Sequence, residues 1–326
     1  MKVEPETRDA RYLDLSLGLV QRQTKKGRSV NLSLALRHAR VEPQYRSVTA
    51  PLQADRQEDS AELAALLGSV TAQASYTLAE DNLDRIPSIL TTRTRRAAGN
   101  LSLPLRDVFA ATGGGAIWLP SISYTLDRTH QFGTAVPDNG DFTAPFVPDQ
   151  VSLNQTGSFD WNAGRFRAGL RLGLSDQDNR QPERERADLR VFTSGVSLAG
   201  SPATGLDLGL EAAREQSENL EFEQETETLR YGLNITWQVS KAVSFSSLLS
   251  WTESEDHPFT RASEAWNADA QIAWRFDLRK TERHGFGGRL FARYVVQDAN
   301  SRDSFTGVLP GARSWRVSSG LSLSLF

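Results

Sequence analysis

Charged side chains recur on one side of several alternating segments of this 326-residue sequence. Arg167 and Arg171 are four residues apart, as are Asp207 and Glu211, and this spacing places each pair on one face of an extended strand. The full predicted set on this face is Arg167, Arg171, Asp207, Glu211, Arg230, Asp269, Arg275, Arg289, Arg293 and Arg316. Such a lining either selects solutes by charge or forms arginine–carboxylate pairs that hold the wall rigid, and the two roles can coexist.

Residues for metal or nucleophilic chemistry are sparse. The histidines are His38, His130, His257 and His284, and none lies in a His-Glu-x-x-His spacing or beside a Gly-x-Ser-x-Gly motif. The absence of cysteine excludes thiol catalysis and cysteine-ligated zinc. His257 lies in an acidic segment and is the best local candidate for a catalytic residue at a rim, against the simpler interpretation of a solvated histidine. We therefore expect no enzyme, no metal site and no cofactor.

Three other polar segments have both a functional and a plain interpretation. The glutamates of 214–227 could bind divalent cations, but their spacing matches no calcium loop and a run of charges is usually solvated. Residues 59–67 resemble a short capped helix, lying either at the surface or inside a lumen. The glycines of 113–115 indicate a turn, because no Lys-Ser/Thr follows them as in a phosphate-binding loop.

The elements that would position these residues are amphipathic strands. Apolar and polar residues alternate through most of the chain, as in the segment from Trp266 to Phe276, and period two indicates β-strands. We count about fourteen such strands (12–16 possible), each much longer than the five or six residues usual in globular proteins. No apolar stretch is long enough for a membrane helix.

Aromatic residues lie near the ends of these strands. Trp266 and Trp274 share a face eight residues apart, as do Phe286 and Tyr294. At about 3.3 Å per residue and a tilt near 40°, eight residues climb roughly 20 Å, close to the apolar band of a membrane barrel with its two aromatic girdles. The predicted interface aromatics are Trp118, Trp161, Trp237, Trp251, Trp266, Trp274, Phe286, Tyr294 and Trp315.

Loop lengths alternate in the second half of the chain. Short turns follow Trp161, Leu198 and Val239, whereas longer polar loops are predicted at 176–188, 214–227, 253–264 and 298–313. Outer-membrane barrels combine short periplasmic turns with long extracellular loops. The first half fits this pattern less well, so either the strand count there is off by one or two or a long insertion lies at the short-turn end.

Together, the strands, the aromatic girdles and the terminal Phe326 resemble Gram-negative outer-membrane β-barrel proteins as a class. The resemblance implies an all-β antiparallel transmembrane barrel over 11–326, preceded by an extension at 1–10. It implies location in the bacterial outer membrane, contact with its lipid and lipopolysaccharide, and recognition by the barrel-assembly machinery. Phe326 departs from the usual pattern, because Leu321, Leu323 and Leu325 have the opposite parity.

Two functions remain open on these observations. The first is a channel or transporter for small polar or charged solutes, and the second is an anchoring barrel of a larger surface or export protein. The first residues, Met1–Pro5, contain no apolar signal-peptide core, so we expect a mature or truncated chain, or one that lacks an N-terminal periplasmic domain. A net charge of −3 gives no support for nucleic-acid binding. A soluble sandwich or solenoid is the alternative fold.

Overall fold

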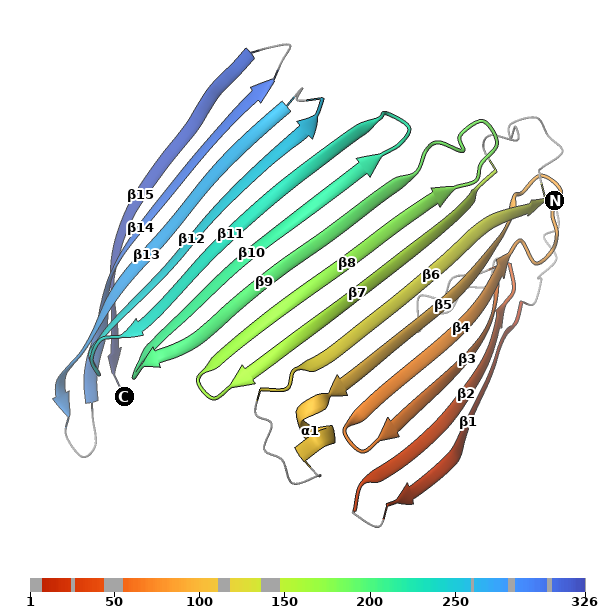
Figure 1. The fold of residues 1–326 in the computed structure, drawn as a ribbon, viewed down its shortest axis with the longest axis horizontal. Helices are drawn as coiled ribbons and strands as arrows, with labels where there is room; N and C mark the ends of the chain where they lie inside the picture. Colours follow the sequence, from red (N-terminus) through yellow and green to blue (C-terminus); the bar gives the residue numbers. More distant parts are fainter. Residues whose placement is uncertain are drawn as a thin grey trace, which may run out of the picture.

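The computed structural model describes residues 8–24, 27–43, 55–110, 118–135, 147–258, 261–280, 285–303 and 307–325. These residues form fifteen strands and one short helix (Figure 1). The elements are β1 (Ala10–Gln23), β2 (Ser29–Val41), β3 (Arg56–Leu67), β4 (Val70–Asp81), β5 (Thr91–Pro104), α1 (Leu105–Ala110), β6 (Ser121–Ala135), β7 (Asp149–Ala163), β8 (Phe166–Asn179), β9 (Leu189–Ala203), β10 (Leu206–Asn219), β11 (Gln224–Gln238), β12 (Val243–His257), β13 (Arg261–Lys280), β14 (Gly285–Asp303) and β15 (Gly307–Leu325).

All fifteen strands belong to one sheet in which each strand pairs with its neighbours in the sequence. The pairs are antiparallel, so the chain runs up and down across the sheet. The predicted all-β antiparallel class is confirmed, with fifteen strands where about fourteen were expected. In the part of the chain that the structure describes, β1 and β15 form the two edges and are not hydrogen-bonded to each other (Figure 1). Closure into a ring therefore stays a prediction.

The register sorts the side chains onto two faces. Leu210, Leu233 and Leu249 follow one another in a row across three strands, and the row continues through Ala268 and Val296. We call this side of the sheet the apolar face. The next row holds Glu211, Gly232, Ser250, Asn267 and Gln297, and we call its side the polar face. The alternation in the sequence thus becomes a difference between the two surfaces of one sheet.

The apolar face has no cover among the described residues. Among all the described residues, the only buried apolar ones are Val41, Val151 and Ala273, and no large side chain is fully buried. Leu13 is 67% exposed and Leu210 is 51% exposed. A soluble sandwich packs its apolar faces against each other, so this arrangement does not match the soluble alternative.

Tight turns join the strands at one end of the sheet. Gly164 and Gly205 occupy the two-residue connections after β7 and β9 with φ of 61° and 76°. Two-residue hairpin loops require such positive φ, which glycine adopts without a steric penalty. The helix α1 lies at this same end, in the connection between β5 and β6 (Figure 1). In the first half of the chain the predicted strand count was too low by one, because β3 was not counted among the strands.

The helix is bound to a neighbouring turn. Arg28, which precedes β2, donates from Nη2 to the carbonyl oxygens of Val108 at 3.1 Å and Asp107 at 3.4 Å. A cation near the last carbonyls of a helix offsets their unpaired partial charges. Within the described residues, no helix is long and apolar enough to cross a membrane.

The helix predicted for residues 59–67 is wrong. These residues lie within β3 and pair along their whole length with β2 and β4. The capping signals at Asp59 and Glu62 are local, whereas the hydrogen bonds to two neighbouring strands involve every residue of the segment. Tertiary pairing therefore overrides the helical propensity of the alanines and leucines.

Several predicted loops are shorter than expected. The predicted loop at 214–227 contains only a turn at 220–223, because β10 runs to Asn219 and β11 begins at Gln224. Similarly, β12 continues to His257 and β14 to Asp303. The apolar alternation stops before the strands end, while backbone pairing continues through polar pairs such as Glu218 with Glu225. Hydropathy alone therefore underestimates the strand length.

Candidate functional site

All ten charged residues predicted to share one side lie on the polar face. Asp207 and Glu211 occupy the face of β10 opposite to Leu210, and the register carries this side across to Arg230 on β11. Arg167 and Arg171 of β8 lie on the same polar face, as the register of β8 with β9 and of β9 with β10 shows. Asp269, Arg275, Arg289, Arg293 and Arg316 follow on β13, β14 and β15. Their role as a selective lining or as a wall network stays a prediction.

Few of these residues pair with each other. Arg293 donates from Nε to both carboxylate oxygens of Asp269, at 2.9 and 3.1 Å. Arg230 lies 3.9 Å from Glu215, and Asp207 accepts a hydrogen bond from the Ser201 hydroxyl. No ion pair within the described residues involves Arg167, Arg171, Glu211, Arg275, Arg289 or Arg316. The two ion pairs formed by these ten residues, Arg293 with Asp269 and Arg230 with Glu215, each join neighbouring strands.

A hollow lies in the polar face between β6 and β11. Its volume is about 770 Å³, and its charged lining residues are Asp160, Arg171, Glu211 and Arg230. Hydroxyl groups supply much of the remaining lining, from Ser123, Thr125, Thr156, Ser158 and Ser197. These hydroxyl residues were not singled out from the sequence, although their parity, opposite to that of the apolar residues, was a usable signal.

The floor of this hollow has a regular pattern. In the register, Arg171 of β8 pairs with Gly195, Gly195 pairs with Ala213, and Ala213 pairs with Arg230 of β11. Two arginines thus lie in one row with only a glycine and an alanine between them. A second, smaller hollow of about 140 Å³ adjoins the first and shares these four residues.

The predicted interface aromatics that lie on strands are on the apolar face. Tyr231, Trp251 and Trp266 form a row across β11, β12 and β13, with ring centroids 5.1 and 6.0 Å apart. Trp274 lies eight residues from Trp266 and contacts Phe276, with ring centroids 5.3 Å apart. Trp161, Trp237, Tyr294 and Trp315 lie on the same face. Their role at a membrane interface remains a prediction.

Trp118 and Phe286 differ from the other predicted interface aromatics. Trp118 is not on a strand, because it precedes β6 in the connection from α1, where it is 72% exposed. Its apparent alternation with Ile122 is interrupted by Pro120, which does not continue a paired strand. The backbone of Phe286 lies on β14, but its side chain lies outside the described residues, as does Phe326.

A carboxylate binds the indoles of the aromatic row. Both Trp251 and Trp266 donate from Nε1 to Oε1 of Glu264 at 2.9 Å. Tryptophan usually finds a partner for its N–H where one end of the ring is apolar and the other is wet. This end of the apolar face therefore changes from aromatic to acidic side chains.

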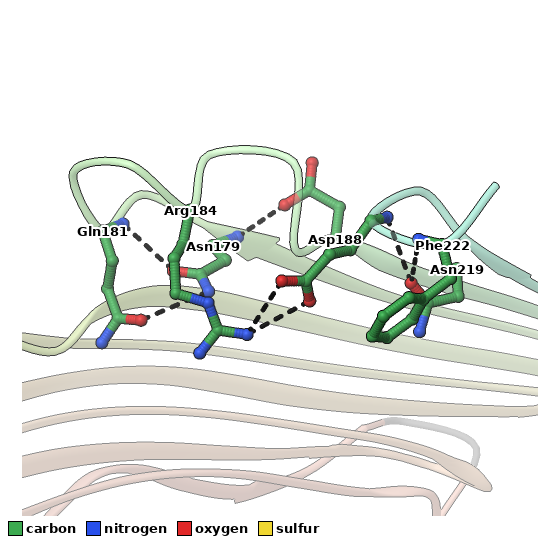
Figure 2. Close-up of polar contacts among 7 residues, drawn as sticks. Asn179, Gln181, Arg184, Asp188, Asn219 and Phe222 are labelled. Atoms are coloured by element: carbon green, nitrogen blue, oxygen red, sulfur yellow. Dashed lines mark hydrogen bonds and ion pairs between the residues drawn. The ribbon is translucent and has the colours of Figure 1, made fainter. Parts of the chain in front are cut away.

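The opposite end of the sheet from the tight turns carries an ordered rim. The loop at 180–188 reaches the turn at 220–223, where Arg184 donates from Nη2 to both carboxylate oxygens of Glu221 at 3.2 and 3.1 Å (Figure 2). Asp188 Oδ1 accepts a hydrogen bond from the Asn179 amide at 2.7 Å. At the start of this loop, the hydrogen bond and the charge of Asp178 raise the pKa of the Arg180 guanidinium.

A second ordered rim turn joins β4 to β5. Asn82 is 3% exposed and has a φ of 51°. Its Nδ2 donates to the carbonyls of Ile86 at 3.1 Å and Ile89 at 3.0 Å, and to Thr91 Oγ1 at 2.9 Å. Its Oδ1 accepts from the Ile86 amide at 2.8 Å. The Asn82 side chain thus hydrogen-bonds to residues along the whole turn, from Ile86 to Thr91.

The histidines are dispersed. His38 Nδ1 lies 2.6 Å from Asp59, and His130 Nε2 lies 2.9 Å from Asp149. His257 ends β12, and His284 lies outside the described residues. Among the residues that the structure covers, no group of three metal-binding side chains occurs. The six glutamates predicted as a possible cation-binding loop are divided between two paired strands and the turn between them.

Comparisons with known proteins agree at the level of the class. No family model and no characterised protein sequence matches the chain. Solved structures that resemble it include OmpT, an outer membrane protein of Vibrio cholerae, at 8% identity and a TM-score of 0.34 over 99% of this chain and 98% of OmpT. The anion-selective porin of Comamonas acidovorans matches at 10% identity and a TM-score of 0.29, over 97% and 99% of the two chains.

The siderophore receptor PirA of Acinetobacter baumannii matches all of this chain at 11% identity and a TM-score of 0.43, and the chain spans 60% of PirA. The solved structures that this chain resembles are Gram-negative outer-membrane β-barrel proteins, the class predicted from its strands.

Proposed function

We propose that this protein is an outer-membrane β-barrel that conducts small polar or charged solutes through a lumen lined by its polar face. The observation that carries the proposal is the division of one long sheet into an uncovered apolar face and a charged, hydroxyl-rich face. Water on both sides would leave the apolar residues unfavourably exposed. Lipid on one side and water on the other satisfies both faces.

The spacing of the aromatic residues supports a membrane on the apolar face. Trp266 and Trp274 are separated by Ala268, Ala270 and Ile272 on that face. Eight residues of a tilted strand climb roughly 20 Å, which places the two indoles near opposite boundaries of the apolar band. Glu264, which accepts hydrogen bonds from the indoles of Trp251 and Trp266, then lies toward the lipid headgroups.

The edges of the sheet require closure in such an environment. Unpaired backbone groups of β1 and β15 would each cost several kcal/mol in lipid. In a meander of fifteen strands, the first and the last run in the same direction. We infer that β1 and β15 meet in a parallel seam when the protein is in a membrane, which makes the polar face an enclosed lumen.

Planar-bilayer recording tests the proposal. The refolded full chain should produce discrete conductance steps, whereas the same protein left unfolded in denaturant should produce none after dilution into the chamber. Insertion is checked independently by floating the protein with lipid vesicles through a density gradient. Protein that inserts and folds but gives no steps would overturn the channel and favour an anchoring barrel.

A further inference from the structure

We propose that the hollow between β6 and β11 is a binding site for a small solute that carries an oxyanion, with Arg171 and Arg230 as its anion-binding residues. The solute class is a phosphate monoester with a polar, hydroxylated body. The inference deepens the proposed function, since it names the solute of the same polar face. It rests on the cavity, on the row that joins the two arginines and on the partners each arginine has.

Arg171 has no acidic partner within the described residues. Its side chain is exposed, and the neighbours on its own face of β8 are Gly169 and Gly173. Across the pair with β9 it meets Gly195. These glycines add no side chain of their own beside the guanidinium group. The side chains that lie over them are Thr193 over Gly173, and Ser197 and Asp160 over Gly169. On the β7 side, Arg171 pairs with Ser158. Asp160 lines the same hollow, but its Oδ2 accepts from the Ser158 hydroxyl at 3.2 Å.

Arg230 faces Arg171 from the other side of the floor. Their strands, β8 and β11, are three inter-strand spacings apart, which is about 14 Å. This distance is comparable to the combined reach of two extended arginine side chains. Arg230 lies 3.9 Å from Glu215, too far for a short charge-assisted hydrogen bond. Its guanidinium therefore retains donors that can bind a solute.

The remaining carboxylate of the hollow lies to one side. A Cβ at position 232 would lie 2.7 Å from Glu211 Cγ, so the Glu211 side chain lies over Gly232. Gly232 belongs to the row next to that of the arginines. The space directly above Gly195 and Ala213 is thus bounded by two cations. Arginine binds phosphate oxygens through its planar set of donors.

The rest of the hollow matches a hydroxylated body. The lining hydroxyls continue from β9 to β7 and β6, ending at Ser123, whose Oγ lies 2.7 Å from that of Ser158. A volume of about 770 Å³ exceeds what inorganic phosphate alone needs. Hydroxyl groups donate and accept hydrogen bonds, so they suit a sugar-like body better than an apolar one.

Binding of three probes to the refolded full chain in detergent micelles tests the site. Glucose 6-phosphate should bind most tightly, inorganic phosphate more weakly and glucose weakest, as measured by isothermal titration calorimetry. The Arg171→Gln and Arg230→Gln variants should each weaken glucose 6-phosphate binding by about tenfold or more, the range expected for loss of a charge-assisted contact. The Gly195→Leu variant should abolish binding without a change of charge.

The matched control is Arg167→Gln, on the same strand and face as Arg171 but outside the lining of the hollow. It should change the binding constant by less than about twofold, because it removes the same charge at a different place. Equal loss in the Arg167→Gln and Arg171→Gln variants, or no binding by the unmodified protein, would overturn the site. Circular dichroism verifies that each variant folds. Because binding is measured without a bilayer, failure of conductance and failure of the site are distinguishable.

Discussion

Asp269 of β13 and Arg293 of β14 form a bidentate pair although they are not directly opposite each other. Asp269 pairs in register with Val295, and Arg293 with Gln271, so the ion pair is diagonal. Diagonal neighbours on one face remain within reach of long side chains. Charges on the polar face are therefore matched locally, between adjacent strands, where a partner exists.

Substitution of this pair should alter ion selectivity more than stability. The side chains of Asp269 and Arg293 are 32% and 48% exposed, so solvent screens their attraction. The Asp269→Asn variant should lower the free energy of unfolding by no more than about 1 kcal/mol. It leaves Arg293 without its acid, so the reversal potential in a salt gradient should shift toward anions.

The control for this prediction is the exchange variant Asp269→Arg/Arg293→Asp, which should return the selectivity toward that of the unmodified protein. A loss of about 3 kcal/mol or more in the Asp269→Asn variant would instead identify the pair as a buried structural bond. Urea titration followed by tryptophan fluorescence provides the stability measurement.

A charge on the apolar face should be costly in lipid. Leu210 lies on that face and is 51% exposed, whereas Asn234 lies on the polar face of the neighbouring strand. The Leu210→Arg substitution should lower stability in lipid vesicles by about 2–4 kcal/mol. The Asn234→Arg substitution adds the same side chain toward the lumen and should cost less than about 1 kcal/mol. Equal effects of the two variants would contradict the assignment of the faces.

Closure can be measured by cross-linking because the chain contains no cysteine. We expect a disulfide between Ser16→Cys on β1 and one of three polar-face positions of β15 changed to cysteine, at Ser314, Ser318 or Ser322. Bonding requires Cα atoms about 4.4–6.8 Å apart, which a direct seam provides at one register. The bond should form within one chain in folded, vesicle-inserted protein, as seen by gel mobility.

The matched control combines Ser16→Cys with Ser246→Cys, on the polar face of β12 and distant in strand order from the seam. It should give no bond within the chain. Cross-links that form only between two chains would show that the edges pair with a second copy instead.

Asn82 should contribute strongly to the turn between β4 and β5. Its removal leaves buried backbone groups without partners, so Asn82→Ala should lower the free energy of unfolding by about 2–3 kcal/mol. Asn82→Gly also loses the side chain but tolerates the φ of 51°, so it should be milder by about 1 kcal/mol. Denaturant unfolding in micelles measures both. Identical losses would mean that the backbone conformation contributes nothing.

The sequence predicted the strands and their two faces because a strand has a fixed period of two. Arg275 and Trp274, for example, were assigned to opposite sides from parity alone, and the register places them there. Where polar residues occupy both the odd and the even positions of a strand, the alternation of apolar and polar residues is lost, and the sequence no longer indicates a strand. The polar ends of β10 and β12, up to Asn219 and His257, were therefore predicted to be loops.

By itself the sequence determined that the chain forms a long antiparallel sheet with one apolar and one charged side, since hydropathy and parity are local properties. Only the tertiary structure decided which charges meet. Arg293 found Asp269, whereas Arg171 was placed among glycines across a hollow from Arg230. The physical reason is register: hydrogen bonding between strands sets which rows align, and no single strand contains that information.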